Sequence, residues 1–260
     1  MKISVIIPAY NCEKTISRAI DSINNQVEHG FDVEIIIIND KSTDSTGYII
    51  KDLVYKFRNI IYIENDKNMG VSHSRNVGLK IASGEYIFFL DADDYYQFNK
   101  FSVFFSILND FKPQFIFHGW EYNNISSPKG TGKVIRLKKW FLYLNLIRNK
   151  ICTPCVVMKN TREFFFDEKL SHMEDLELWT RIIFSSKENY IINSPLTILG
   201  HELNKGTGLS SDNEKMREME LVMYRRLLEK HYISKIQFYL YKGIHLIKKC
   251  KDFYKAVSRV

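Results

Sequence analysis

The sequence predicts an α/β protein built on a mostly parallel sheet with helices on its faces. Over the first hundred residues, short apolar runs alternate with segments of helical periodicity, which is typical of strands joined by right-handed helical crossovers. The run Glu34–Asn39 is almost entirely isoleucine, as expected of a parallel strand covered on both faces. Polar residues follow several of these runs directly, at the strand ends where such sheets bind ligands.

The opening residues MKISVIIPAYN are predicted to form the first strand. A signal peptide is not expected, because Asn11 and Glu13 stand where a small-residue cleavage site should be. The predicted strands of the first half are Ser4–Pro8, Glu34–Asn39, Ile60–Glu64 and Tyr86–Leu90. Between them lie helices over Lys14–Asn25, over the segment that Asp44 or Ser45 can cap, and over Val71–Ile81.

After Asp94 the periodicity weakens. Here the sequence predicts a strand at Gln114–His118, a loop at Asn124–Lys133, and helices over Lys138–Arg148, Asp175–Phe184 and Asp212–Lys230. No repeat, low-complexity segment or clear linker interrupts the 260 residues. A chain of this length can form one large domain, or a domain with an appendage.

The net charge of +7 is concentrated near the C-terminus. Residues 233–260 contain seven basic residues and one acidic residue, so this segment carries +6 and the rest of the chain about +1. Nucleic-acid binding is not expected, because no recognition motif accompanies the charge.

No apolar run approaches the ~20 residues that span a bilayer. With no export signal and four cysteines, the expected location is the cytoplasm.

The basic tail is predicted to form an amphipathic helix. An apolar stripe lies within about 60° of a common direction, with basic residues flanking it. The stripe comprises Ile236, Leu240, Gly243, Ile247, Cys250, Tyr254 and Val257. Two interpretations stay open: a helix lying on an anionic membrane, at the inner face of the plasma membrane, or a helix packed on its own domain or on a partner.

Two aspartates predict a cation site. Asp91 and Asp93 directly follow the apolar run IFFL, so both carboxylates project from the end of a buried strand. Mg²⁺ and Mn²⁺ bind one or two carboxylates together with substrate phosphates. The alternative is a polar turn with a helix-capping aspartate.

By contrast, Cys152 and Cys155 lack further nearby ligands, so no metal or redox role is expected for them.

Five motifs in order resemble glycosyltransferase family 2, whose members have the GT-A fold. They are SVIIPAYN, IIINDKSTDST, ENDKNMGVSHSRNVGLK, FFLDADD and HMEDLELWTR. The resemblance covers about Lys2 to His201. It implies a catalytic domain over 1–210, with a nucleotide-sugar-binding half (1–110) and an acceptor-binding half (111–210), followed by a helical extension over 211–260.

The resemblance implies a nucleotide pocket at the first two strand ends. Pro8, Ala9 and Tyr10, followed by Asn11, would line it, and Tyr10 would stack on the base. Asp40 would hydrogen-bond the base or ribose. The alternative for Asp40 is a helix cap, a role that Ser42 or Asp44 could also fill. The family usually has glycine where this chain has Lys41, so a differently shaped loop is expected.

The remaining motifs imply donor, metal and catalytic groups. Arg75 and Asn76 would lie near the nucleotide, Asp91 and Ala92 near the donor's ribose and sugar, and Asp93 on a metal that bridges the diphosphate. In the pair Glu174 and Asp175, Asp175 would be the catalytic base; the alternative is a favourable interaction with the helix dipole. His201 would contact the diphosphate or the metal, or be structural. Lys205, Gly206 and Gly208 would suit a mobile lid.

Together these motifs predict an inverting transferase that uses Mn²⁺ or Mg²⁺. The expected donor is a nucleotide-diphosphate sugar carrying a hexose or N-acetylhexosamine, with uridine diphosphate as the usual nucleotide of the family. The expected acceptor is a hydroxyl of a cell-surface, lipid-linked or protein-linked glycan.

Two other classes remain as alternatives. A nucleotidyltransferase should carry a glycine-rich loop after the first strand, and PAYNCEKT has no glycine. A non-catalytic nucleotide-sugar binding protein would not need the base at Asp175. A dinucleotide oxidoreductase is excluded because no G-x-G-x-x-G follows a strand.

Overall fold

A computed structural model of the chain describes residues 1–26, 32–122, 132–200 and 212–257. The elements of the first half follow the predicted alternation. They are β1 (Lys2–Ala9), α1 (Ile16–Asn24), β2 (Asp32–Asn39), α2 (Thr46–Lys56), β3 (Ile60–Glu64), α3 (Val71–Ile81) and β4 (Tyr86–Phe89). These bounds confirm the predicted strands and helices of this half to within a few residues.

The second half contains more strands than the sequence predicts. Its elements are β5 (Tyr95–Tyr96), α4 (Lys100–Asp110), β6 (Phe115–Tyr122), β7 (Val134–Arg136), α5 (Lys139–Ile147), the 3₁₀ turn η1 (Thr153–Cys155), β8 (Val156–Lys159), α6 (Glu174–Ser185), β9 (Asn189–Leu199), α7 (Asn213–Glu229) and α8 (Lys235–Val257). Helix α4 and strands β5, β7, β8 and β9 were not predicted.

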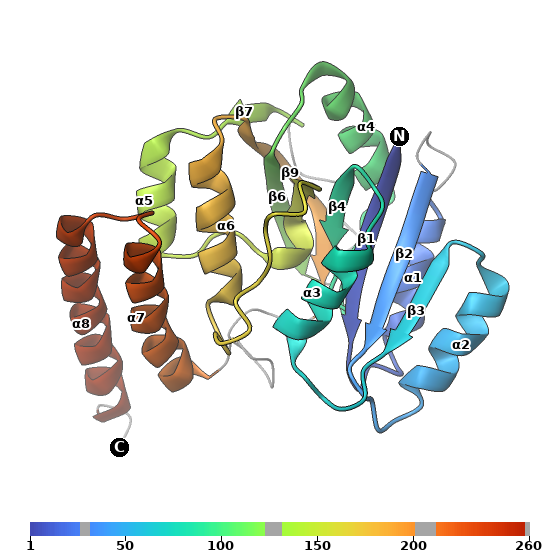
Figure 1. Ribbon diagram of the computed structural model, residues 1–260, viewed down its shortest axis with the longest axis horizontal. Coiled ribbons are helices and arrows are strands. Elements are labelled where there is room, and N and C mark those ends of the chain that lie inside the picture. The colour runs from blue at the N-terminus through green and yellow to red at the C-terminus, as the bar shows by residue number, and fades with distance from the viewer. Residues whose placement is uncertain (27–31, 123–131, 201–211, 258–260) are drawn as a thin grey trace.

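All the strands of the described residues join one sheet in the order β3-β2-β1-β4-β8-β6-β9-β5, with β7 also paired to β9 (Figure 1). Strands β1 to β4 pair in parallel, as predicted. Beyond β4 the pairs of β8, β5 and β7 are antiparallel, and only β6 and β9 are parallel. The predicted α/β sheet with flanking helices is therefore confirmed; its first half is parallel, and the antiparallel pairs of the second half make the whole sheet mixed.

The pleat of the central strands divides the core between two faces. Alternate isoleucines of β2 point to opposite sides: Ile35 and Ile37 contact the layer that contains α1, α2 and α4, and Ile36 and Ile38 contact the layer that contains α3, α5 and α6. A strand buried on both faces has little freedom to shift register, because every position is apolar and packed. The sheet therefore holds its strand ends in fixed relative positions.

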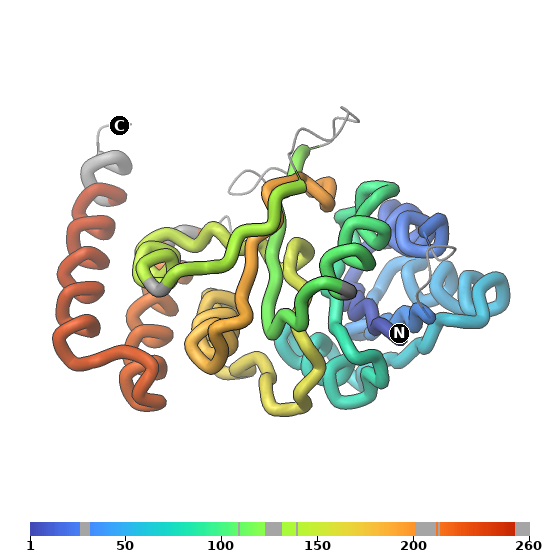
Figure 2. Tube along the Cα trace, turned by 90° about the horizontal axis from the view of Figure 1, so that it is seen from above, coloured from blue at the N-terminus to red at the C-terminus, as the bar shows by residue number. Residues whose placement is uncertain are grey.

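The last two helices lie side by side at the end of the molecule opposite β3 (Figures 1 and 2). They form a separate apolar cluster with α6, in which Tyr224 and Leu227 of α7 meet Tyr241 of α8. The predicted boundary between a catalytic domain and a helical extension falls just before α7 and stays a prediction. No helix of the described residues combines the length and apolarity needed to cross a bilayer.

Candidate functional site

The polar residues predicted at the first two strand ends lie together. Asn11, just after β1, has a left-handed backbone (φ 48°). Its side-chain oxygen accepts a hydrogen bond from the backbone of Thr43 (2.8 Å), and its own N–H donates to the Ser42 hydroxyl (3.0 Å). Since Ser42 and Thr43 follow β2, these bonds join the two loops. Beside them Ala9 is buried, Pro8 is partly buried, and the Tyr10 ring is half exposed.

Asp40 is buried and organises the loop before α3. Its carboxylate accepts hydrogen bonds from the backbone N–H groups of Met69 (2.8 Å) and Gly70 (2.7 Å) and from the Asn65 side chain (2.7 Å). It does not cap α2; Asp44 accepts from the Thr46 N–H at the start of that helix instead. The next residue, Lys41, has φ 59°, the left-handed region that glycine favours, so lysine here keeps a glycine-like backbone.

Arg75 links two of the predicted motifs. It is buried on α3, and its guanidinium donates to Asp91 (2.8 Å) and to Glu174 (3.3 Å). Burial alone would lower the pKa of Arg75, but the charges of Asp91 and Glu174 outweigh it and the pKa is raised. The arginine is therefore a permanent cation between the end of β4 and the start of α6.

Asn76 has a different position from its neighbour. Its amide donates to the carbonyl of Phe166 (3.0 Å) and to Glu168 (2.8 Å), and its oxygen accepts from the Phe166 N–H (2.8 Å). All its polar groups are used to hold residues 166–168 against α3. Asn76 thus supports the site rather than facing it.

The three aspartates after β4 differ in their surroundings. Asp91 and Asp93 are partly exposed, whereas Asp94 is buried and accepts from the Gly200 N–H (2.9 Å). Burial, followed by the charges of Asp91 and Asp93, raises the pKa of Asp94 to about 9. The concentration of negative charge indicates a place where a cation would be stabilised.

Two contacts fix the backbone at Asp93. Arg18 of α1 donates to the Asp93 carbonyl (2.8 Å), and its guanidinium lies over the Tyr95 ring, 4.5 Å from the centroid. On the other side, a Cβ at Gly200 would come within 2.2 Å of the same carbonyl oxygen. Glycine is therefore required where the end of β9 passes the aspartates.

The acidic pair stands at the first turn of α6. Met173, immediately before it, adopts a left-handed backbone (φ 64°), which costs a non-glycine residue about 1–2 kcal/mol. One Asp175 oxygen accepts from the Leu176 N–H (2.6 Å) and the other from the Asn149 amide (3.2 Å). These bonds fix the orientation of the carboxylate.

Both members of the pair hold protons more tightly than ordinary carboxylates. Burial, and then the charge of Asp175, raises the pKa of Glu174 to about 7, against the opposing effect of Arg75. Burial also raises the pKa of Asp175, although the hydrogen bond from Leu176 and the charge of Arg75 act in the other direction. A carboxylate of raised pKa is a better proton acceptor, which suits a general base.

The donor set fits a hard divalent cation that also binds a diphosphate. Asp91 and Asp93 supply oxygens, and their charges add to the effect of burial that raises the pKa of Asp94. No cluster of three or more histidine, cysteine or acidic side chains arranged for a metal occurs in the described part of the chain. A cation held by two carboxylates and substrate oxygens needs no such cluster.

Some predicted residues are not placed, and some important ones were not predicted. His201, Lys205, Gly206 and Gly208 lie outside the described residues. Arg18 and Asn149 were missed, because an arginine on a helix and an asparagine in a loop carry no motif in the sequence. Cys155 is buried at the end of η1, and its predicted lack of a metal or redox role stays a prediction.

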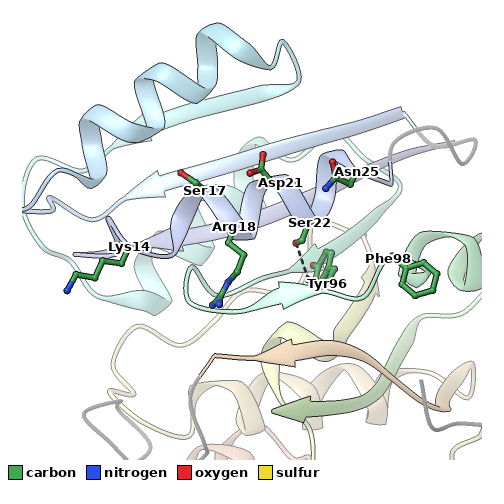
Figure 3. A pocket seen from close by; sticks show the side chains of 8 residues that line it. All are labelled: Lys14, Ser17, Arg18, Asp21, Ser22, Asn25, Tyr96 and Phe98. Carbon is green, nitrogen blue, oxygen red and sulfur yellow. Dashed lines mark hydrogen bonds between the residues drawn. The ribbon is translucent and has the colours of Figure 1, made fainter. Parts of the chain in front are cut away.

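A surface hollow lies between α1 and the chain around β5, next to the aspartates' backbone. Its lining residues are Lys14, Ser17, Arg18, Asp21, Ser22, Asn25, Tyr96 and Phe98 (Figure 3). Figure 3 shows Arg18 reaching from α1 toward β5. The hollow contains none of the predicted donor or catalytic residues. At its edge, Arg18 of α1 supports the segment that follows β4.

Comparison with known families and proteins gives one consistent result. The family model described as "Glycosyl transferase family 2" matches residues 4–168. The chain is 32% identical over 263 residues to the UDP-Glc:alpha-D-GlcNAc-diphosphoundecaprenol beta-1,3-glucosyltransferase WfaP of Escherichia coli, covering 96% of each chain. It is 48% identical over 96 residues to the poly(ribitol-phosphate) beta-glucosyltransferase of Bacillus spizizenii, covering 36% of this chain and 15% of that relative.

The solved structures that resemble the chain show the same fold. TarS (residues 1–349) of S. aureus, in complex with UDP-GlcNAc, has a TM-score of 0.70 at 21% identity, with 89% of this chain and 68% of that chain covered. The mannosyltransferase PcManGT of Pyrobaculum calidifontis, in complex with GDP-Man and Mn²⁺, has a TM-score of 0.62 at 16% identity, covering 87% and 64%. Several relatives are far longer than this chain, which spans 13–26% of their length.

Proposed function

The chain belongs to glycosyltransferase family 2 and has the GT-A fold, and on that premise we propose that it is an inverting, metal-dependent glycosyltransferase. The Arg75 bridge between Asp91 and Glu174 carries the proposal. Through this bridge, the end of β4, which would meet the donor, is joined to α6, which carries the proposed base Asp175. A protein that only bound nucleotide sugars would have no need of an oriented carboxylate at Asp175.

We propose that the nucleotide lies against the ends of β1 and β2. The half-exposed Tyr10 ring would stack on the base beside Pro8, Ala9 and Asn11. Asp40 already accepts three hydrogen bonds from its own chain, so its part includes shaping the loop around the nucleotide. Asp91 and Ala92 would meet the ribose and sugar, and His201 the diphosphate or the metal.

Asp93, with Asp91, would hold Mn²⁺ or Mg²⁺. When bound, such an ion offsets the negative charge that builds up on a departing diphosphate. Arg18 and Gly200 fix the backbone at Asp93, so these residues would hold the ligand carboxylate in a constant position.

Asp175 would accept the proton of the acceptor hydroxyl. The hydroxyl oxygen attacks the anomeric carbon from the side opposite the leaving group, and a new carbon–oxygen bond forms as the bond to the diphosphate oxygen breaks. The proton moves to the Asp175 carboxylate, which Asn149 and the Leu176 N–H hold in place. General base catalysis contributes roughly 10²–10⁴-fold, and one displacement inverts the anomeric configuration.

We propose uridine diphosphate as the nucleotide, a hexose or N-acetylhexosamine as the sugar and a lipid-linked glycan as the acceptor. The support is the E. coli relative, whose name gives a UDP-glucose donor and a diphosphoundecaprenol-linked acceptor and which matches this chain over almost its whole length. Action on such an acceptor would place the protein at the inner face of the plasma membrane.

The direct test is release of nucleoside diphosphate from a panel of nucleotide sugars, with a soluble lipid-linked acceptor, with Mn²⁺ and with EDTA. We expect turnover with a UDP-sugar, its loss in EDTA and in Asp93→Ala, and a product of inverted configuration by NMR. Release of pyrophosphate instead would indicate a nucleotidyltransferase. Binding without turnover of any donor would contradict the enzyme assignment, and full activity in EDTA would remove the metal from the proposal.

A further inference from the structure

Helix α8 is held in one orientation by the face that it turns toward α7. The Tyr241 ring stacks on Tyr224 with centroids 5.1 Å apart. His245 is buried and contacts the buried Glu220 of α7 (2.9 Å). Lys248 also pairs with Glu220 and donates to the Ile147 carbonyl. The rotation of the helix about its axis is thereby fixed.

The opposite face of α8 is apolar and open to solvent. Its large side chains are exposed by 83% at Ile236, 67% at Tyr239, 59% at Leu240, 52% at Leu246 and 68% at Ile247. Single exposed apolar residues are ordinary on protein surfaces, but five on one helix face form a contiguous patch of the kind that marks an interaction site. The patch includes Ile236, Leu240 and Ile247 of the stripe predicted from the sequence, and these three side chains point away from the body.

Lysines border this patch. Lys235, Lys242 and Lys249 recur every seven residues and are exposed along one side, and Lys251 is exposed on the other. The only acidic residue between Ser234 and Asp252 is Asp252 itself, which pairs with Arg217 of α7 (2.8 Å). The outward face thus combines an apolar centre with basic margins, and the described part of α8 adds no acidic residue to it.

The lysines around the patch favour an anionic membrane over a second copy of the chain as its partner. A second copy docked on the same face would bring the two rows of lysines together, with no acidic residue of α8 free to pair with them. A bilayer containing anionic lipids supplies negative headgroups beside an apolar layer, which matches both features. Lysine stems can also extend to the headgroups while the apolar residues enter the interface.

We propose that the outward face of α8, centred on Ile236, Leu240 and Ile247 and bordered by Lys235, Lys242 and Lys249, binds an anionic phospholipid surface. The helix lies flat on the interface while its inner face stays packed on α7. This surface complements the proposed function but does not depend on it, because it shares no residue with the transferase site.

The test uses the full-length protein and sedimentation with vesicles of phosphatidylcholine with or without phosphatidylglycerol. Wild-type protein should sediment with the anionic vesicles at low salt and be released as salt rises. The variant Ile236→Ser/Leu240→Ser/Ile247→Ser should lose at least about tenfold in partitioning. Lys242→Gln/Lys249→Gln should lose roughly 30-fold, since each lysine near an anionic surface contributes roughly fivefold.

A matched control removes equally exposed apolar residues elsewhere. Tyr48 and Tyr55 on α2 are exposed by 77% and 89%, and Tyr48→Ser/Tyr55→Ser should bind vesicles as wild type does. All variants should keep the wild-type melting temperature and the activity on a soluble acceptor. Failure of the transferase assay would leave the vesicle result unaffected, so the two proposals fail separately.

Four results would overturn the inference. The first is wild-type protein that does not bind anionic vesicles at low salt, and the second is equal binding to neutral and anionic vesicles. The third is an apolar variant that binds as well as wild type does. The fourth is a dimer, seen by light scattering, that the apolar substitutions dissociate in the absence of vesicle binding; a second copy then covers this face.

Discussion

At the scale of single residues, Asp175 has the surroundings of a proton acceptor. Asp175→Asn keeps the size of the side chain and removes the charge that accepts a proton. We expect turnover to fall at least about 100-fold with little change in nucleotide affinity. Calorimetry with UDP and Mn²⁺ measures the affinity, and Asp110→Asn, at the exposed end of α4, is the control. A large loss of affinity would instead make Asp175 a structural or metal-binding residue.

Asn149 should act through Asp175 and affect the pH dependence of the reaction. Its amide donates to the Asp175 carboxylate, which favours the charged form and lowers the pKa of that carboxyl. In Asn149→Ala the pKa of Asp175 rises. Because the base works deprotonated, the acid limb of kcat/KM should move to higher pH, with activity above the limb nearly unchanged.

A pH profile of kcat/KM between pH 5 and 9 measures this shift. The pH profile of the double variant Asn149→Ala/Asp175→Asn should match that of Asp175→Asn. The carboxyl group whose pKa Asn149 affects is absent from both. Equal loss of activity at every pH would mean that Asn149 serves another role, such as contact with the acceptor.

At the scale of elements, helix α1 supports the site from outside it. Arg18 holds the Asp93 carbonyl and lies over Tyr95. In Arg18→Ala that support is lost, so the Mn²⁺ concentration for half-maximal activity should rise roughly tenfold, as is usual when a residue supporting a metal ligand is removed. Lys14→Ala, an exposed position in the turn just before the same helix, should change nothing. An unchanged metal requirement in Arg18→Ala would show that the contact is incidental.

The elements that the sequence predicts best are those that local pattern determines. Strand β2 is a run of buried isoleucines, and α1 has its apolar residues at helical spacing. Strand β8 has four residues, and β9 contains Asn193 and Pro195, so neither shows a clear period. Their places depend on pairing with β4 and β6 across the sheet, and pairing between distant segments is absent from local sequence.

The site residues also divide into those that local sequence motifs identify and those whose contacts depend on distant parts of the chain. Asp91, Asp93, Glu174 and Asp175 belong to motifs, so the sequence could single them out, and their roles stay predictions. The contact between Arg75 and Glu174 joins residues 99 positions apart, and no spacing rule predicts it. The buried state of Asp40 also depends on the later loop at Met69 and Gly70.

At the scale of the whole molecule, α8 is part of the folded body. The sequence left open whether removal of residues 234–260 would be harmless. The structure shows Tyr241 and His245 buried against α7, so truncation after Ile233 would expose Tyr224 and leave Glu220 without two of its partners. We expect a melting temperature lower by roughly 10 °C, or aggregation.

Thermal unfolding of the truncated chain, compared with the full-length Ile236→Ser/Leu240→Ser/Ile247→Ser variant, checks this expectation. The two changes affect opposite faces of α8, so only the truncation should destabilise the protein. A truncated chain as stable as the full-length protein would show that α8 adds nothing to the core.

The Arg75 bridge has a consequence for the order in which the molecule folds. Its partners come from the first strands of the sheet and from α6, and the intervening chain must first fold into β6 and β8 on the other side of β4. Closing so long a loop is entropically costly and is repaid only when the sheet is complete. On the proposed mechanism, a nascent chain therefore acquires its catalytic base, Asp175 of α6, only after the strands β1 to β4 that would meet the nucleotide have been synthesised.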